Sequence, residues 1–238
     1  MELRVLKYGN LMGTPDAKEI LLRAGPGSEL AHARWLEMAR IKTAFGYNGQ
    51  CTSVLLVDEE PSEVFPALVD PSFLTATGDA AAAVTTALTM IRDAGITPDA
   101  IKSVLVTHAH ADHFDPRLLA ELPQAQAYCH PQAPIDGCKD FDPDRFASKI
   151  TALNTPGHGG PHSSYLLELA EFDLSICLAG DLIMSHAHYL ARQHPLSFTQ
   201  PEQGLASIEA VRKAMLQRGR KYNLVFPGHD LPFFLLDE

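Results

Sequence analysis

Several features that would place this chain in a specialised class of protein are absent or scarce. The four cysteines (Cys51, Cys129, Cys138 and Cys177) lie far apart and form no CxxC motif. The first seven residues mix charged with apolar side chains, unlike a secretory signal peptide. The longest run of small apolar residues, 80–91, is too short to span a bilayer. We therefore expect a cytoplasmic protein with reduced, buried thiols and no membrane partner.

Positive charge is scarce as well, because 19 lysines and arginines stand against 29 aspartates and glutamates. The net charge of -10 disfavours a broad surface for nucleic acid or anionic membrane, since either needs a basic face. Small anionic substrates are still allowed, because a bound metal ion brings its own positive charge. We expect a small-molecule substrate and no nucleic-acid partner.

The length and composition of the chain favour one globular unit. At 238 residues and 46% hydrophobic content it can form a substantial core. No internal repeat or low-complexity linker divides it, so we predict one domain over residues 1–238. The role of residues 11–50 is open: they form either an insertion that shapes a pocket mouth or a surface hairpin and helix.

The most informative feature present is a dense histidine cluster in residues 107–113, with the sequence THAHADH. It follows the apolar run Ser103–Val106, which is short and β-branched and therefore predicts a buried strand. Proteins with α/β architecture commonly place chemistry at the C-terminal end of such a strand. Because neutral imidazole and carboxylate are ligands of zinc, iron and manganese, the cluster predicts a metal site.

Three distant segments also end an apolar strand with a candidate ligand. They are His158 within the sequence TPGHGG, Asp181 after AG, and His229 after PG. A glycine before the ligand lets the backbone turn sharply and lets the ligand project into a crowded site. Each segment alone is a weak signal, because such dipeptides are common in turns, but together with the cluster they predict one shared site.

Hydrophobic patterning predicts the elements that carry these segments. We expect strands at residues 3–8, 52–57, 65–69, 103–106, 126–130, 150–154, 164–169, 174–178 and 223–226. We expect helices at residues 79–94, 116–122 and 202–217, the last with Leu205, Ile208, Val211 and Met215 on its apolar face. Two groups of strands with few helices between them indicate packed sheets covered by helices.

The order of these motifs resembles the metallo-β-lactamase superfamily, over roughly residues 52–235. The family signature is HxHxDH, then a GH turn, then an aspartate after a strand and a last GH, all of which occur here. The resemblance implies an α+β fold, the four-layer αββα sandwich of the metallo-β-lactamase fold, with a di-metal centre along one edge. Matching positions imply that His108, His110 and His158 bind the first metal, that Asp112, His113 and His229 bind the second, and that Asp181 bridges both.

Further residues are candidates for supporting roles. Asp70 matches the strand-end aspartate of the family's first motif and would support the ligands, although Asp58 is a nearby competitor and Asp-Pro-Ser replaces the usual Asp-x-Gly. His162 lies four residues after His158, as in the GHxxxH turn of superfamily lactonases and thioesterases, and is either a supporting or a solvated residue. The residues that follow Asp181 and could line the substrate pocket are His186, His188 and Tyr189.

The implied cofactor is a pair of divalent ions, most simply zinc, with iron or manganese as alternatives. Such ions would share a water and lower its pKa to about 7. The resulting bridging hydroxide would attack the substrate, with Asp112 as proton shuttle. No GxSxG motif supplies a serine nucleophile. The FPGHD form of the last motif resembles lactonases and thioesterases, so hydrolysis of a small ester, lactone or thioester is our leading prediction.

Two other activities stay open at this point. Sulfur dioxygenases of this fold keep an HxHADH-type cluster but use one iron ion, which makes a mononuclear iron oxidoreductase the first alternative. A phosphodiesterase or nuclease of the same fold is the second, and the acidic charge and the lack of a domain inserted between Asp181 and His229 weigh against it. The natural substrate and the oligomeric state, a homo-oligomer included, are not determined by the sequence.

Overall fold

The structure is a computed structural model that describes residues 1–9, 50–60, 62–74, 78–192 and 200–235. The strands are β1 (Glu2–Lys7), β2 (Ser53–Val57), β3 (Ala67–Val69), β4 (Ser103–Leu105), β5 (Gln126–Cys129), β6 (Lys139–Asp140), β7 (Ile150–Asn154), β8 (Ser163–Leu169), β9 (Leu174–Gly180), β10 (Tyr222–Pro227) and β11 (Phe233–Phe234). The helices are α3 (Ala80–Asp93), α4 (Pro116–Ala120), α5 (His186–Ala191) and α6 (Pro201–Leu216), with short 3-10 turns at Pro98–Ala100, Ala170–Phe172 and Asp181–Ile183.

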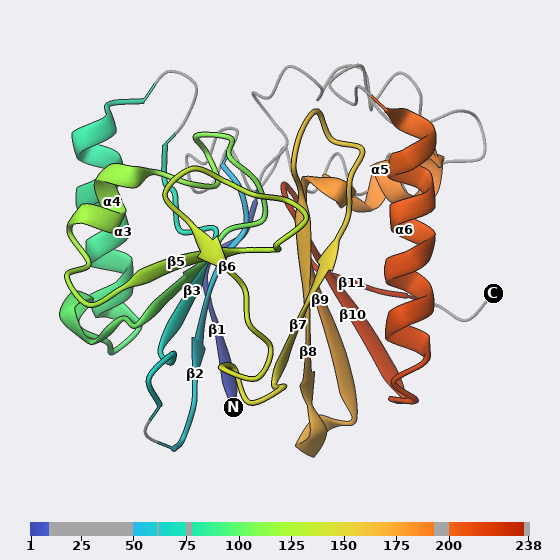
Figure 1. Cartoon of the computed structure of the whole chain (residues 1–238), viewed down its shortest axis with the longest axis horizontal. Coiled ribbons are helices and arrows are strands. Elements are labelled where there is room, and N and C mark those ends of the chain that lie inside the picture. Colours follow the sequence, from blue (N-terminus) through green and yellow to red (C-terminus); the bar gives the residue numbers. More distant parts are fainter. Residues whose placement is uncertain (10–49, 61, 75–77, 193–199, 236–238) are drawn as a thin grey trace.

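Two sheets pack face to face, and helices cover their outer faces (Figure 1). The first sheet has the strand order β1-β2-β3-β4-β5-β6, and the second has the order β11-β10-β9-β8-β7. Helices α3 and α4 lie against the first sheet, and α6 lies against the second. This arrangement confirms the predicted α+β sandwich.

Alternation along the strands produces the layers. In β2, Val54 and Leu56 point between the two sheets, whereas Leu55 between them points to the helices of the first sheet. In β9, Ile176 points between the sheets and Cys177 points toward α6. Successive side chains of a strand face opposite sides, so a strand buried on both faces is apolar throughout, as the sequence pattern indicated.

Helix α3 forms where its cap and its apolar spacing predicted it. The Asp79 carboxylate accepts a hydrogen bond from the backbone N–H of Ala81, and this satisfies one free donor of the first turn. Ala83, Ala87 and Ile91 recur every four residues and are buried against the first sheet. Burial of this stripe, together with the cap, fixes the helix on the sheet.

Helix α6 corrects one prediction about its buried face. Val211 and Met215 are buried as expected, but Leu205 is 38% exposed. The residues buried near the start of the helix are instead the small Gly204 and Ser207. They allow close approach to the turn before His158, where the Ser207 hydroxyl donates to the Pro156 carbonyl at 2.7 Å. Helix α6 therefore positions a candidate ligand as well as covering a sheet.

Three short elements were not predicted from the sequence. These are β6, β11 and α5, with two, two and six residues. Such short segments carry too little periodicity to be recognised, and β6 and β11 extend existing sheet edges. The segment 11–50, whose role the sequence left open, lies outside the described residues except for Gln50.

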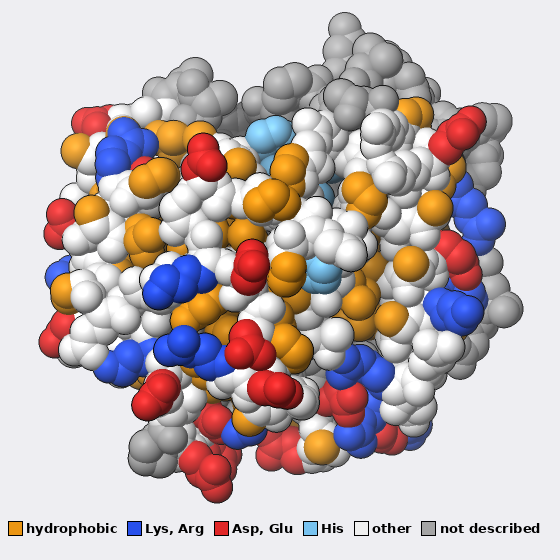
Figure 2. All heavy atoms as spheres, viewed as in Figure 1, with side chains coloured by type: hydrophobic (Ala, Val, Ile, Leu, Met, Phe, Trp, Pro, Cys, Tyr) orange, Lys and Arg blue, Asp and Glu red, His pale blue; other side chains and the backbone are white. Residues whose placement is uncertain are grey.

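The surface agrees with the composition of the chain. On the face seen in Figure 2, basic and acidic side chains are interspersed, and the described residues there form no continuous basic area. Among the described residues, no helix combines the length and the apolar character that a bilayer crossing requires.

Candidate metal centre

All the predicted ligands meet at one edge of the sandwich. The 107–113 segment follows β4 of the first sheet, and His158, Asp181 and His229 follow or end β7, β9 and β10 of the second. Strand β4 runs parallel to β3 and β5, and β9 runs parallel to β10, so each group brings its carboxyl ends to the same side. Ligands far apart in sequence are therefore adjacent in space.

Two glycines allow the strand ends that carry the candidate ligands to approach this closely. Gly180 has a positive φ of 55°, and a Cβ added there would lie 2.6 Å from the Thr107 hydroxyl oxygen. A Cβ on Gly228 would lie 2.1 Å from the Asp181 Oδ1 atom. Both contacts are far shorter than atoms tolerate, so glycine is required at both positions.

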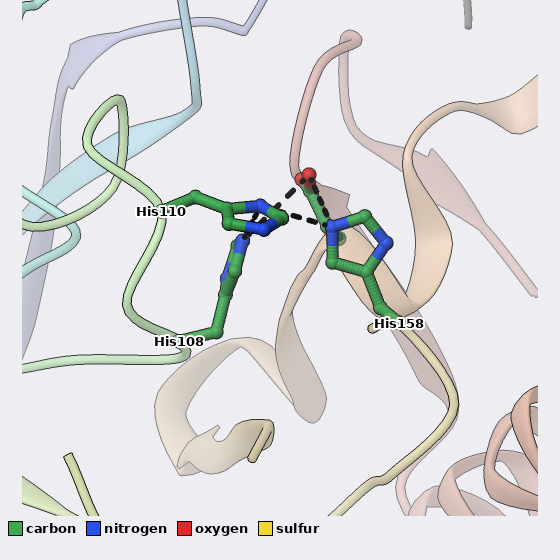
Figure 3. Close-up of side chains that lie close together, drawn as sticks. His108, His110 and His158 are labelled. Atoms are coloured by element: carbon green, nitrogen blue, oxygen red, sulfur yellow. Dashed lines mark hydrogen bonds and ion pairs between the residues drawn. The ribbon is translucent and has the colours of Figure 1, made fainter. Parts of the chain in front are cut away.

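The first group of donor atoms comprises three imidazoles and one carboxylate. The His110 Nδ1 atom lies 2.9 Å from His108 Nε2 and 3.2 Å from His158 Nε2 (Figure 3). The Asp181 Oδ2 atom lies 3.2 Å from His158 Nε2 and 3.8 Å from His108 Nε2. Donor atoms about 2.0–2.1 Å from one tetrahedral zinc ion are about 3.3 Å apart, which these distances approach.

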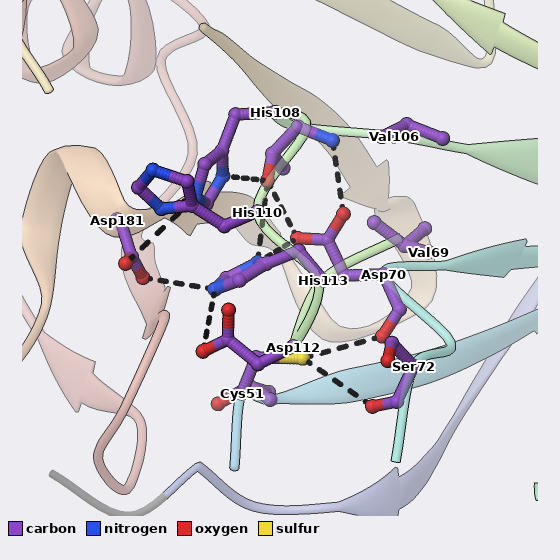
Figure 4. Close-up of polar contacts among 12 residues, drawn as sticks. Cys51, Val69, Asp70, Ser72, Val106, His108, His110, Asp112, His113 and Asp181 are labelled. Atoms are coloured by element: carbon purple, nitrogen blue, oxygen red, sulfur yellow. Dashed lines mark hydrogen bonds and ion pairs between the residues drawn. The ribbon is translucent and has the colours of Figure 1, made fainter. Parts of the chain in front are cut away.

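The second group uses the other oxygen of the same aspartate. Asp181 Oδ1 lies 3.1 Å from His113 Nε2 (Figure 4), and it lies 3.2 Å from His229 Nε2. Asp112 Oδ2 lies 3.4 Å from His229 Nε2 and 4.0 Å from His113 Nε2. Asp181 therefore lies between the two groups with one carboxylate oxygen toward each.

Hydrogen bonds fix which ring nitrogen of each histidine faces the centre. The Nδ1 atom of His113 donates to the Asp70 carboxylate at 2.9 Å, and that of His229 donates to the Gln50 carbonyl at 2.9 Å. Because Nδ1 carries the proton in both rings, the neutral tautomer leaves a lone pair on Nε2. Both Nε2 atoms face carboxylate oxygens, an arrangement that needs either a proton or a metal ion between them.

The fit to a metal is supported by the buried atoms themselves. Neither His113 Nε2 nor Asp181 Oδ1 makes a hydrogen bond of acceptable geometry with the described residues, although both are buried. Buried polar atoms are normally satisfied, so such orphaned atoms indicate a missing partner. Imidazole nitrogen and carboxylate oxygen are the donors that zinc, iron and manganese accept. The residues present therefore fit divalent metal ions.

The electrostatics of the centre point in the same direction. Burial would raise the pKa of Asp181, but His229 and His113 hold that pKa well below its ordinary range, so the carboxylate stays ionised. Burial, together with the neighbouring His113, holds the pKa of His108 well below its ordinary value. His108 is therefore a neutral imidazole at neutral pH, the form that binds a metal.

Asp70 holds the histidine loop in position through hydrogen bonds. Its Oδ1 accepts the Thr107 backbone N–H at 2.9 Å, and its Oδ2 accepts the Thr107 hydroxyl at 2.7 Å and His113 Nδ1. Asp70 itself adopts a left-handed φ of 45° at the end of β3. The competing Asp58 lies elsewhere, in an ion pair with Lys149. The carboxylate that reaches the histidines is thus that of Asp70.

His162 is buried and is not a solvated turn residue, which excludes one of its two interpretations. Its Nε2 accepts the Leu182 backbone N–H at 3.2 Å, and its Nδ1 lies 2.8 Å from the Thr155 hydroxyl. The ring also stacks on His108 with centroids 5.1 Å apart. With Nε2 occupied by a donor, His162 links the Asp181 turn to the ligand turn instead of joining either donor group.

The three candidates after Asp181 lie on or beside α5, outside both donor groups. The His186 ring stacks on Phe233 with centroids 4.2 Å apart, and Tyr189 lies 5.3 Å from the same ring. His188 is buried, and its Nδ1 accepts the Met184 backbone N–H at 3.1 Å. Their predicted role in a substrate pocket stays a prediction.

Sequence reasoning missed the residues that hold the ligands through backbone contacts. Thr52 donates from its hydroxyl to the Pro227 carbonyl at 2.7 Å, and its N–H donates to Gly228. The Ser72 hydroxyl donates to the Ala111 carbonyl at 2.6 Å. Neither serine nor threonine has a distinctive spacing here, so no sequence signal pointed to them.

Comparisons with known proteins agree with this geometry. The family model described as the metallo-beta-lactamase superfamily matches residues 46–114, the part with the histidine cluster. A Thermotoga maritima protein assigned to the metallo-β-lactamases is 19% identical, with a TM-score of 0.59 over 98% of this chain and 99% of that chain. The chain is thus similar to the metallo-β-lactamase superfamily in residues 46–114, and over nearly its whole length it has the metallo-β-lactamase fold.

Other structures with the metallo-β-lactamase fold carry metals of different kinds. AidC, a dizinc quorum-quenching lactonase in complex with a homoserine product, is 13% identical, with a TM-score of 0.56 over 79% of this chain and 80% of that chain. A protein in a di-iron-bound form is 20% identical, with a TM-score of 0.52 over 78% of this chain and 90% of that chain. At these identities the likeness establishes the fold only. No curated protein matches the sequence.

Proposed function

We propose that this metallo-β-lactamase-fold chain is a hydrolase that uses two divalent metal ions to cleave an ester, lactone or thioester bond in a small molecule. The observation that carries the proposal is the position of Asp181, with one oxygen toward each donor group. The lactonase activity of AidC, which has the same fold, supports this substrate class. Zinc is the first choice of metal, with iron and manganese as alternatives.

The donor groups divide the work of holding the ions. His108, His110, His158 and Asp181 would hold the first ion, and Asp112, His113, His229 and Asp181 the second. When bound, such ions polarise a carbonyl oxygen and make a coordinated water acidic enough to attack near neutral pH. The Asp70 carboxylate and the Gln50 carbonyl accept hydrogen bonds from the Nδ1 atoms of His113 and His229. The Thr107 hydroxyl contacts Nδ1 of His108, so each ring is held in orientation through its second nitrogen.

Asp112 is the residue best placed to move a proton. Its side chain is 27% exposed, whereas that of Asp181 is 4% exposed. One carboxylate oxygen reaches His229 Nε2 at 3.4 Å, and the exposed part of the side chain faces solvent. Asp112 would accept a proton from the attacking water at Oδ and return it to the leaving oxygen or sulfur.

The second donor group argues against the mononuclear iron alternative. A one-iron oxidoreductase needs a single set of ligands, whereas here His113 and His229 lie 3.1 and 3.2 Å from Asp181 Oδ1. Asp112 Oδ2 lies 3.4 Å from His229 and 4.0 Å from His113, which completes a second set of donors. A phosphodiesterase would need the same two ions, so it differs from the proposed hydrolase only in its substrate.

The test combines metal analysis with a substrate panel. Protein purified without added metal should contain about two ions per chain, and the zinc or manganese form should hydrolyse lactones or thioesters in preference to phosphodiesters. Asp112→Asn should lower kcat about 100-fold or more, whereas Asp93→Asn, at the exposed end of α3, should not change it. One iron per chain with oxygen consumption on a persulfide would instead support the dioxygenase.

A further inference from the structure

A second group of reactive side chains lies outside the metal centre, where β5 meets β6. Cys129 ends β5, and Cys138 directly precedes β6, which pairs with β5 in parallel. Both side chains pack in the core layer between the first sheet and its helices. All four cysteines of the chain are free thiols, and these two are the pair that the fold brings together.

The surroundings of Cys129 favour its thiolate. The neighbouring Cys138 thiol and, to a smaller extent, the Ile135 backbone lower the pKa of Cys129 to about 7 against the effect of burial. The remaining buried thiols behave in the opposite way. Burial raises the pKa of Cys51 to about 11 and raises that of Cys177 still further. Cys129, the thiol whose pKa lies nearest neutrality, is thus the one with a second thiol beside it.

We propose that Cys129 and Cys138 form a reversible disulfide when the protein reacts with hydrogen peroxide. The Cys129 sulfur attacks one peroxide oxygen, the O–O bond breaks, and a sulfenic acid and hydroxide form; a proton converts this hydroxide to water. The Cys138 thiol then attacks the sulfenic sulfur, the S–S bond forms, and the sulfenic oxygen leaves with the thiol proton as a second water. The dithiol supplies the two electrons that reduce the peroxide to two waters.

The loop between the two cysteines favours closure. The Cys138 backbone N–H donates to the Ile135 carbonyl at 3.0 Å, and Gly137 has a left-handed φ of 83°, so the chain turns back before β6. Cys138 is only half-buried, and this gives a small peroxide access to the pair. A partner thiol beside the sulfenic acid prevents its further oxidation.

The pair also lies close to the metal-binding loop. Residue 130, directly after Cys129, donates its N–H to the Ser163 hydroxyl at 3.3 Å. The Ser163 N–H donates to the Thr107 carbonyl at 2.7 Å, directly before His108. Only two hydrogen bonds separate the end of β5 from the histidine loop, so a disulfide here would fix one support of that loop. Counting the free thiols, however, tests disulfide formation independently of any hydrolase activity.

The experiment counts thiols in the full chain. Reduced protein is exposed to hydrogen peroxide at neutral pH, denatured, alkylated with iodoacetamide and weighed by mass spectrometry. We expect two alkyl groups in place of four, and four again after treatment with dithiothreitol. Cleavage before aspartate separates the two cysteines at Asp136, so a non-reduced digest should contain peptide 115–135 joined to peptide 136–139.

Two serine variants make the assignment specific. Cys138→Ser should reduce the yield of the disulfide at least tenfold, so that its three remaining thiols are still alkylated after peroxide treatment. Cys177→Ser, which alters a thiol in the α6 layer, should leave the yield of the disulfide unchanged, and its oxidised product should carry one alkyl group. The proposal is overturned if four alkyl groups persist after the peroxide treatment, if the digest joins another pair of cysteines, or if both variants lower the yield equally. The wild-type digest decides the outcome even if a variant fails to fold.

Discussion

The two donor groups share Asp181, but the pKa values of their histidines are shifted in opposite directions. In the first group, burial lowers the pKa of His108, and partial burial together with His158 lowers the pKa of His110. In the second group, burial opposes but does not cancel the effect of Asp181, which raises the pKa of His229. The first group is therefore neutral and ready for a metal, whereas a proton on the second already compensates the carboxylates.

This difference shows how one carboxylate can belong to two metal-binding groups with different properties. The first group has three imidazoles for one carboxylate oxygen, so its metal-free form carries little charge to be compensated. The second has Asp112 beside Asp181 and only two imidazoles, so it attracts a cation more strongly. A proton therefore competes with the metal ion for binding to this group. We expect different affinities and different pH dependences for two adjacent ions.

The largest effect should come from removing the shared residue. Asp181→Ala deletes one donor from each group, and we expect the metal content to fall from about two ions per chain to below about 0.2. Inductively coupled plasma mass spectrometry after gel filtration measures the content. Retention of one full ion would mean that one of the groups binds independently of Asp181.

The next effect should separate the groups. His158→Ala should remove the first ion and His229→Ala the second, each leaving about one ion per chain. His130→Ala, outside both groups, is the matched control and should keep both ions. If either ligand variant lost both ions, the two groups would not be separable.

A smaller effect should follow from removing a supporting carboxylate. Asp70→Asn weakens the acceptor for His113 Nδ1, and we expect the second ion to bind about 10–100-fold more weakly while the first is retained. Asp58→Asn, which alters an aspartate paired with Lys149 away from the site, should leave both affinities unchanged. Competition with a chromophoric chelator measures each affinity.

The smallest effect should be a difference in proton release. His158→Ala retains the second group, in which the pKa of His229 is raised, so a metal ion must displace a proton there at neutral pH. The affinity of the second group for its metal ion should therefore fall up to about tenfold per pH unit on acidification. His229→Ala retains the first group, whose His108 is already neutral there, so its affinity should stay flat above the ordinary histidine pKa of about 6.5. A pH indicator in weak buffer measures the protons released. Equal release from both variants would contradict the comparison.

The two sheets also differ in how far the sequence predicts their part of the site. The first sheet contributes its ligands from one continuous loop, residues 107–113, and that density is visible in the sequence. The second contributes one ligand per strand end, and only the repeated glycine beside each candidate marked them. The supports from Thr52, Ser72 and Gln50 were not predictable, because backbone carbonyls and single hydroxyls leave no pattern.

The amino-acid sequence by itself determined the layers and the candidate ligands, since apolar alternation and helical spacing act locally and imidazoles are rare enough to stand out. Only the tertiary structure decided that Asp70 and not Asp58 reaches the histidines, that His162 is bound to a backbone N–H, and that each oxygen of Asp181 faces a different group. These outcomes depend on how closely the strand ends approach one another at Gly180 and Gly228, and no local sequence pattern specifies that distance.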